Sequence, residues 1–136
     1  MTTAAQYEHQ IAGLNLQNIP LQGLNKSQAQ ESLEKLLGLQ QRAMEIERAL
    51  KLDLHVIRAQ YQPRIAAATA GITSRVNISD KHRVGGKMRA EELEKVTAER
   101  DEKMAPLERL EKQVEEILAK IAVDRADLEE QAGKTA

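Results

Sequence analysis

The residues best suited to chemistry lie in SDKHRVGGKMR, residues 79–89, where basic side chains surround two adjacent glycines. The step Gly85-Gly86-Lys87, placed before a helix, could offer free backbone N–H groups and an ammonium group to a phosphate. A nucleotide-binding P-loop also needs a glycine five residues before Gly86 and a serine or threonine after the lysine. Neither is present, because Met88 follows the lysine and residue 81 is another lysine. We therefore interpret the glycines as a bend that leads into the next helix.

Positive charge is concentrated around these glycines. Residues 64–89 contain six basic residues and one acidic residue, although the whole chain has a net charge of −1. Five of these cations form a predicted partner-binding segment, called the basic segment below: Arg75, Lys81, Arg83, Lys87 and Arg89. The same charges could bind phosphates with strong salt dependence, but the segment has no aromatic residue on which bases could stack. We expect a protein partner and keep nucleic-acid binding as the alternative.

No pattern in the chain predicts catalysis, a cofactor or a metal site. The three histidines, His9, His55 and His82, are far apart in sequence, and there is no cysteine. Several glutamates belong to Glu–Lys pairs four residues apart, which mark solvated helix faces. We therefore expect a protein that is not an enzyme and that binds no cofactor and no metal.

The composition indicates long helices. The chain of 136 residues has no Trp, Phe or Cys and only two Tyr, while 30% of its residues are charged. Leu, Ala, Glu, Lys and Arg in such proportions are typical of coiled coils and long helices. The N-terminus lacks the features of a signal peptide, and no apolar run is long enough to span a membrane. We expect an all-α, cytoplasmic protein with no membrane contact.

Two helices follow from apolar residues at alternating steps of three and four. The first should span residues 25–62, with Asn25 as N-cap and Gln28 completing a capping box, and Pro63 should bend or end it. The second should span residues 89–131, with a kink or a new start at Pro106. Packed as a long antiparallel hairpin, the helices should meet at Leu36, Leu39, Ile46, Leu50, Leu54, Ile57, Leu107, Leu110, Val114, Ile117 and Ile121.

The connection, residues 63–88, should hold a short helix and a loop. Apolar and polar residues alternate over 72–78, which permits a short strand paired with a second one at 82–86. The tip of the hairpin is therefore either an irregular loop or a small β-hairpin. In its layout, with two helical arms and a β-prone middle, the chain is similar to the prefoldin chaperone subunits. That resemblance implies chaperone-like binding.

The ends of the chain and the remaining apolar residues bear on assembly. Residues 1–24 should form a partly extended arm on the helices, and residues 133–136 a short tail. Five further apolar residues widen the stripes and need a cover: Leu33, Leu37, Met44, Leu52 and Leu118. Self-association into a helical bundle would supply it, and the folded-back arm is the alternative. The sequence thus predicts a scaffold, adaptor or chaperone-like protein. A nucleic-acid accessory protein and a phage or secretion-system assembly component are the other possibilities.

Overall fold

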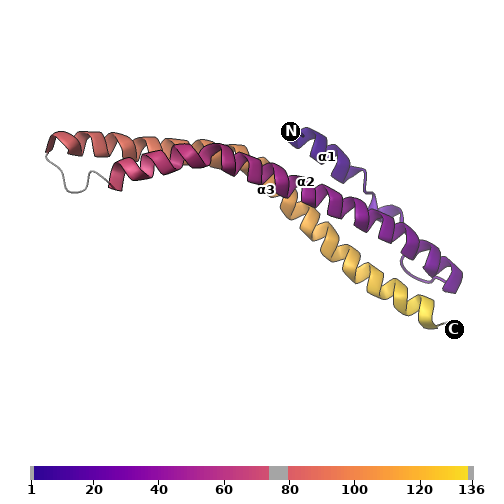
Figure 1. The fold of residues 1–136 in the computed structure, drawn as a ribbon. Helices are drawn as coiled ribbons and strands as arrows, with labels where there is room; N and C mark the ends of the chain where they lie inside the picture. Colours follow the sequence, from indigo (N-terminus) through magenta and orange to yellow (C-terminus); the bar gives the residue numbers. More distant parts are fainter. Residues whose placement is uncertain (1, 74–79, 135–136) are drawn as a thin grey trace. The chain divides into compact units, whose positions relative to one another are not determined.

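The computed structural model describes residues 2–73 and 80–134, with side chains for 2–70 and 90–133, and all of its elements are helical. They are α1 (Ala4–Ala12), a 3₁₀ helix η1 (Leu16–Asn18), α2 (Lys26–Thr73) and α3 (Asp80–Lys134). Figure 1 shows these elements, with the long α2 and α3 packed together. The predicted all-α class is confirmed, and no strand occurs in the described part of the chain.

The N-terminal arm contains more helix than the expected extended arm. Thr3 and Gln6 form a capping box, in which the Gln6 N–H donates to Thr3 Oγ1 and the Thr3 N–H donates to Gln6 Oε1. Gly13 is the C-cap of α1, and its N–H donates to the His9 carbonyl at 3.1 Å. Asn15 and Gly23 have positive φ angles of 44° and 69°, so the chain turns sharply on both sides of η1.

α2 begins at the predicted capping box. The Gln28 N–H donates to Asn25 Oδ1 at 2.8 Å, and the Asn25 N–H donates to Gln28 Oε1 at 3.2 Å. Each of these two hydrogen bonds satisfies a backbone donor that a helix start would otherwise leave without a partner. The position of the cap explains why the helix starts at Lys26.

Helix α2 does not end at Pro63 but continues to Thr73. A proline inside a helix costs about 3 kcal/mol, because one backbone hydrogen bond is lost. Beyond it, the alanine-rich residues 64–70 favour helix, and Tyr61 and Ala68 are buried on either side of the proline. This local gain offsets the loss at one position. Pro106 likewise lies inside α3.

The strand expected at 82–86 is not formed, since these residues belong to α3. α3 begins at Asp80 rather than at residue 89, and it includes Gly133 at its other end. The β-branched residues behind this prediction lie mainly in 74–79, outside the described residues. The resemblance to prefoldin subunits depended on β-structure between the two helices. Because the second strand is absent, we base no further argument on that resemblance.

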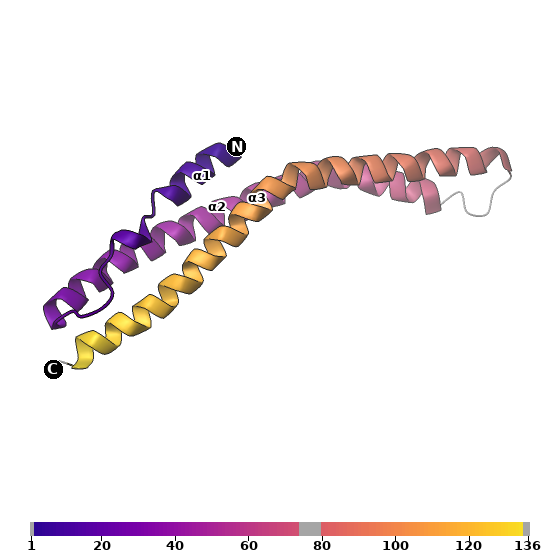
Figure 2. The same ribbon diagram turned by 180° about the vertical axis from the view of Figure 1, so that it is seen from behind.

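Two compact units make up the chain. The first consists of Met1–Lys51 and Arg109–Ala136, and the second of Leu52–Glu108. In the first unit, Gln40 contacts Arg125 while Lys51 lies near Glu111 and Glu115, so its α2 and α3 segments run antiparallel. In the second, Tyr61 contacts Lys103 while Arg64 contacts Glu99, which gives the same relation. The two views in Figures 1 and 2 show α3 beside α2 within each unit.

Each unit has its own interior. The buried apolar side chains of the first unit are Tyr7, Leu14, Ile19, Ala29, Leu36, Ala43, Ile46, Leu50, Leu110, Val114, Ile121 and Leu128. Those of the second are Leu54, Ile57, Tyr61, Ala68, Val96, Met104 and Leu107. In the described parts of α2 and α3, no stretch is long and apolar enough to cross a bilayer.

Candidate interaction surface

Most residues of the predicted helix–helix interface are buried within the chain itself. In the first unit these are Leu36, Ile46, Leu50, Leu110, Val114 and Ile121, and in the second they are Leu54, Ile57 and Leu107. Leu39 and Ile117 are half-buried. Because these side chains are already covered within one chain, they are not available for contact with another molecule.

The N-terminal arm covers one edge of the first unit. Tyr7, Leu14 and Ile19 are its buried anchors. The arm lies next to both long helices. Leu14 lines one shallow hollow together with Leu39 of α2 and another together with Ile117 of α3.

A polar latch fixes the end of the arm to α3. The Gln131 side chain donates from Nε2 to the Leu21 carbonyl at 2.6 Å, and its Oε1 accepts from the Leu24 N–H at 3.3 Å. These groups are about 110 residues apart in sequence, so no local pattern predicts the contact. The arm therefore lies along the edge of the first unit that holds the half-buried Leu39 and Ile117, away from the side of α2 that carries Met44.

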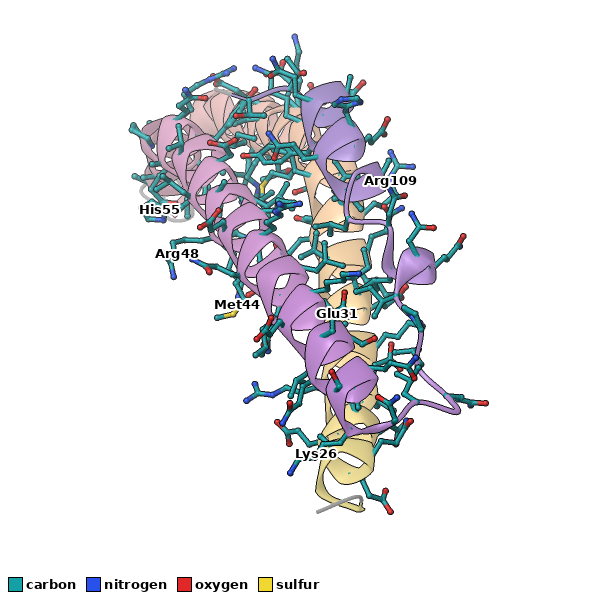
Figure 3. The ribbon with its side chains drawn as sticks, turned by 90° about the vertical axis from the view of Figure 1, so that its right-hand side faces the viewer. Lys26, Glu31, Met44, Arg48, His55 and Arg109 are labelled. Carbon is teal, nitrogen blue, oxygen red and sulfur yellow. The ribbon has the colours of Figure 1, made fainter. Side chains whose placement is uncertain are left out.

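The opposite edge of α2 carries two of the exposed large apolar side chains that the structure describes; the others, Leu52 and Val123, lie elsewhere. Leu37 and Met44 are seven residues apart, two turns of helix, and they keep 38% and 48% of their surface exposed. Leu33, one turn before Leu37, is half-buried on the same side. In Figure 3, Met44 projects from the side of α2 that faces away from α1. Exposed apolar residues grouped on one face are typical of an interaction site.

Helix α3 contributes to the same face of the first unit. Arg125 Nη1 donates to Gln40 Oε1 at 3.5 Å, which places Arg125 beside this edge of α2. Leu118 lies seven residues before Arg125, on the same side of α3, and is half-buried. We call Leu33, Leu37, Met44 and Leu118 the open face.

An acidic cluster borders one end of the open face. The Lys51 ammonium lies 3.2 Å from the Glu47 carboxylate. A hydrogen bond with Glu47 and the charge of Glu47 raise the pKa of Lys51, and the charges of Glu111 and Glu115 add to this. One lysine thus faces three carboxylates at this end.

Basic side chains border the rest of the α2 edge. Lys26 lies 18 residues before Met44, which is five turns of helix, and in Figure 3 Lys26, Met44 and Arg48 project from the same side. Both cations are exposed. Neither forms an ion pair with another residue that the structure describes.

The second unit holds a different cluster, built around the buried Tyr61. Lys103 Nζ lies 5.3 Å and Arg64 Cζ 5.6 Å from the centre of its ring, and Arg64 also pairs with Glu99 at 3.4 Å. A hydrogen bond with Tyr61 raises the pKa of Lys103. The cluster ties α2 to α3 inside this unit.

The basic segment falls largely outside this description. Arg75 lies outside the described residues, and Lys81, Arg83, Lys87 and Arg89 lie in the first turns of α3, with side chains that are not described. Gly85 and Gly86 belong to the helix rather than to a turn before it. The glycine bend expected from the sequence is therefore not observed.

Other candidate sites are weaker. A hollow of about 500 Å³ between α1 and α2 is lined by His9, Gln10, Arg42 and Glu45 among others. These four polar side chains are exposed and not buried in the hollow. Among the described residues, no three side chains of His, Asp or Glu are grouped as metal ligands would be.

Comparison of the chain with protein-family models, curated proteins and solved structures gives no match. Its function must therefore be inferred from its own residues.

Proposed function

We propose that this protein is a non-enzymatic helical interaction protein, a scaffold or adaptor, which self-associates through the open face. In the proposed architecture α3 returns along α2 as a helical hairpin, as the antiparallel contacts within each unit suggest. The basic segment would then be presented to a protein partner.

The exposed apolar residues of the open face carry this proposal. Leu37 and Met44 remain 38% and 48% exposed, although the arm covers the other edge of the same helix. Each gains about 1 kcal/mol when its remaining surface is buried. Two copies that pair through this face bury four such side chains and gain about 4 kcal/mol. This gain only matches the lowest cost of bringing two chains together, about 4 kcal/mol, so pairing of the charges along the border must add to it.

Sedimentation equilibrium of three forms of the protein tests the proposal. We expect the unmodified chain to self-associate, and Leu37→Lys/Met44→Lys to raise the dissociation constant at least about 100-fold. Both positions are exposed in the single chain, so the variant should keep its helical circular dichroism. Ser27→Lys/Val123→Lys is the matched control, because it adds the same charge at two exposed positions outside the open face.

Two results would contradict the proposal. One is a chain that stays monomeric at every concentration. The other is an equal loss of association in the control variant, because Val123 is itself an exposed apolar residue, 62% accessible, and self-association would then use a different face.

A further inference from the structure

We infer that the occupant of the open face is a second copy of this chain, docked antiparallel about a two-fold axis near Gln40. The inference rests on the proposed self-association and adds its geometry. Three observations carry it: the spacing of the apolar side chains, the positions of the charges and the place of the arm.

The apolar spacing suits a two-fold axis. Leu37 lies three residues before Gln40, and Met44 lies three residues after Gln41, so the two are placed symmetrically about this pair of glutamines. An antiparallel copy centred there sets Leu37 of one chain against Met44 of the other, and the same contact occurs twice. A self-complementary patch of this kind is what a two-fold interface requires.

The charges are arranged with the same symmetry. The Gln40–Arg125 hydrogen bond fixes the register between α2 and α3 in the first unit. Lys26 lies 14 residues before Gln40, and Glu111 lies 14 residues before Arg125. Since the two segments run antiparallel, Lys26 and Glu111 lie about 21 Å to opposite sides of this contact. The two-fold axis brings Lys26 of one copy to the acidic cluster of the other.

A parallel arrangement has the opposite effect. It would place the acidic cluster, with Glu47, Glu111 and Glu115 around one lysine, beside its own copy, and Lys26 beside Lys26. Like charges at an interface are unfavourable. Arg125, which lies near the antiparallel axis, pairs with Glu129 at 2.9 Å within its own chain, so its charge is balanced there.

The arm of the same chain is not available as an occupant. Gln131 and the buried anchors Tyr7, Leu14 and Ile19 hold it on the other edge. A second copy, in contrast, brings both the apolar contacts and the matching charges.

Disulfide mapping tests the geometry, because the natural chain has no cysteine. Chains with Leu37→Cys and chains with Met44→Cys, one of them tagged, are oxidised separately and as a mixture. If the dimer is antiparallel, Leu37→Cys of one chain faces Met44→Cys of the other, and the mixture should cross-link. Either preparation alone should cross-link little, because the two identical cysteines of a dimer lie about 10 Å apart along the helix. Cross-linking of Leu37→Cys with itself would overturn the antiparallel arrangement.

Charge exchange provides the second arm of the test. Lys26→Glu alone, and Glu111→Lys/Glu115→Lys alone, should each raise the dissociation constant about fivefold. An equimolar mixture of the two should regain affinity as a heterodimer. Without such recovery, Lys26 does not meet the acidic cluster.

The outcomes separate the two proposals. If the unmodified chain is a monomer, the proposed self-association and this inference both fail. If it is a dimer whose cysteine variants cross-link only like to like, the proposed function stands and the antiparallel geometry is wrong.

Discussion

Gln131→Leu should release the N-terminal arm from α3 without disturbing the apolar core. The substitution keeps a side chain of similar size at a half-buried position but removes its amide. The Leu21 carbonyl and the Leu24 N–H then lose the bonds that the structure shows at 2.6 Å and 3.3 Å. A net contribution of about 1 kcal/mol for each bond gives a loss of about 2 kcal/mol in the docking of the arm.

Hydrogen exchange of the Leu24 amide measures this loss directly. A difference of about 2 kcal/mol corresponds to roughly 30-fold faster exchange, if the amide exchanges through local opening of the arm. Gln113→Leu serves as control, since Gln113 is exposed on the same helix and makes no hydrogen bond among those that the structure gives. Unchanged exchange of Leu24 in Gln131→Leu, or equal acceleration in the control, would refute the latch.

Three further predictions follow from the packing, from one pKa shift and from the charge pattern. Leu50→Ala should lower the free energy of unfolding by about 2–5 kcal/mol in a urea titration, because Leu50 is fully buried and a cavity remains; a change below about 1 kcal/mol would contradict its burial. The pKa of Lys103 is raised by its hydrogen bond with Tyr61, so its contribution to stability is present at neutral pH and is lost as pH rises above about 10.4. The urea midpoint of Lys103→Gln should therefore fall less than that of the unmodified chain as the pH rises above this value. An equal fall in both proteins would argue against the contact between Lys103 and Tyr61. Finally, we expect a protein partner for the basic segment, so neither the unmodified chain nor Arg83→Glu/Lys87→Glu should bind DNA or RNA at low or moderate salt. Salt-sensitive binding by the unmodified chain that this variant abolishes would favour the nucleic-acid alternative.

The all-helical class could be predicted because it depends on many residues at once. Alternating steps of three and four continue through both long helices, and single exceptions such as Pro63 do not cancel them. Local capping chemistry was also readable at Asn25 and Gln28. The same Thr-x-x-Gln type of signal stands at Thr3 and Gln6 and could have revealed α1, but the helix that follows has only nine residues.

The errors arose where a local pattern competed with helix propagation. Alternation over 72–78 suggested strands, whereas α3 includes 82–86. Two adjacent glycines suggested a bend, yet a helix tolerates each of them at a cost of about 1 kcal/mol.

The open face could be predicted only in part. Its apolar residues stood out in the sequence as positions that needed a cover. Which edge the arm would leave bare depends on Gln131 and on the burial of Leu14 and Ile19, contacts between residues far apart in the chain. The match between Lys26 and Glu111 depends on the register of α2 against α3, which the Gln40–Arg125 contact reveals.

The most direct test of the account is the mass of the unmodified chain in solution, measured by sedimentation over a wide range of concentrations. We predict a reversible rise from the mass of one chain to the mass of two. A mass of one chain throughout would contradict self-association through the open face.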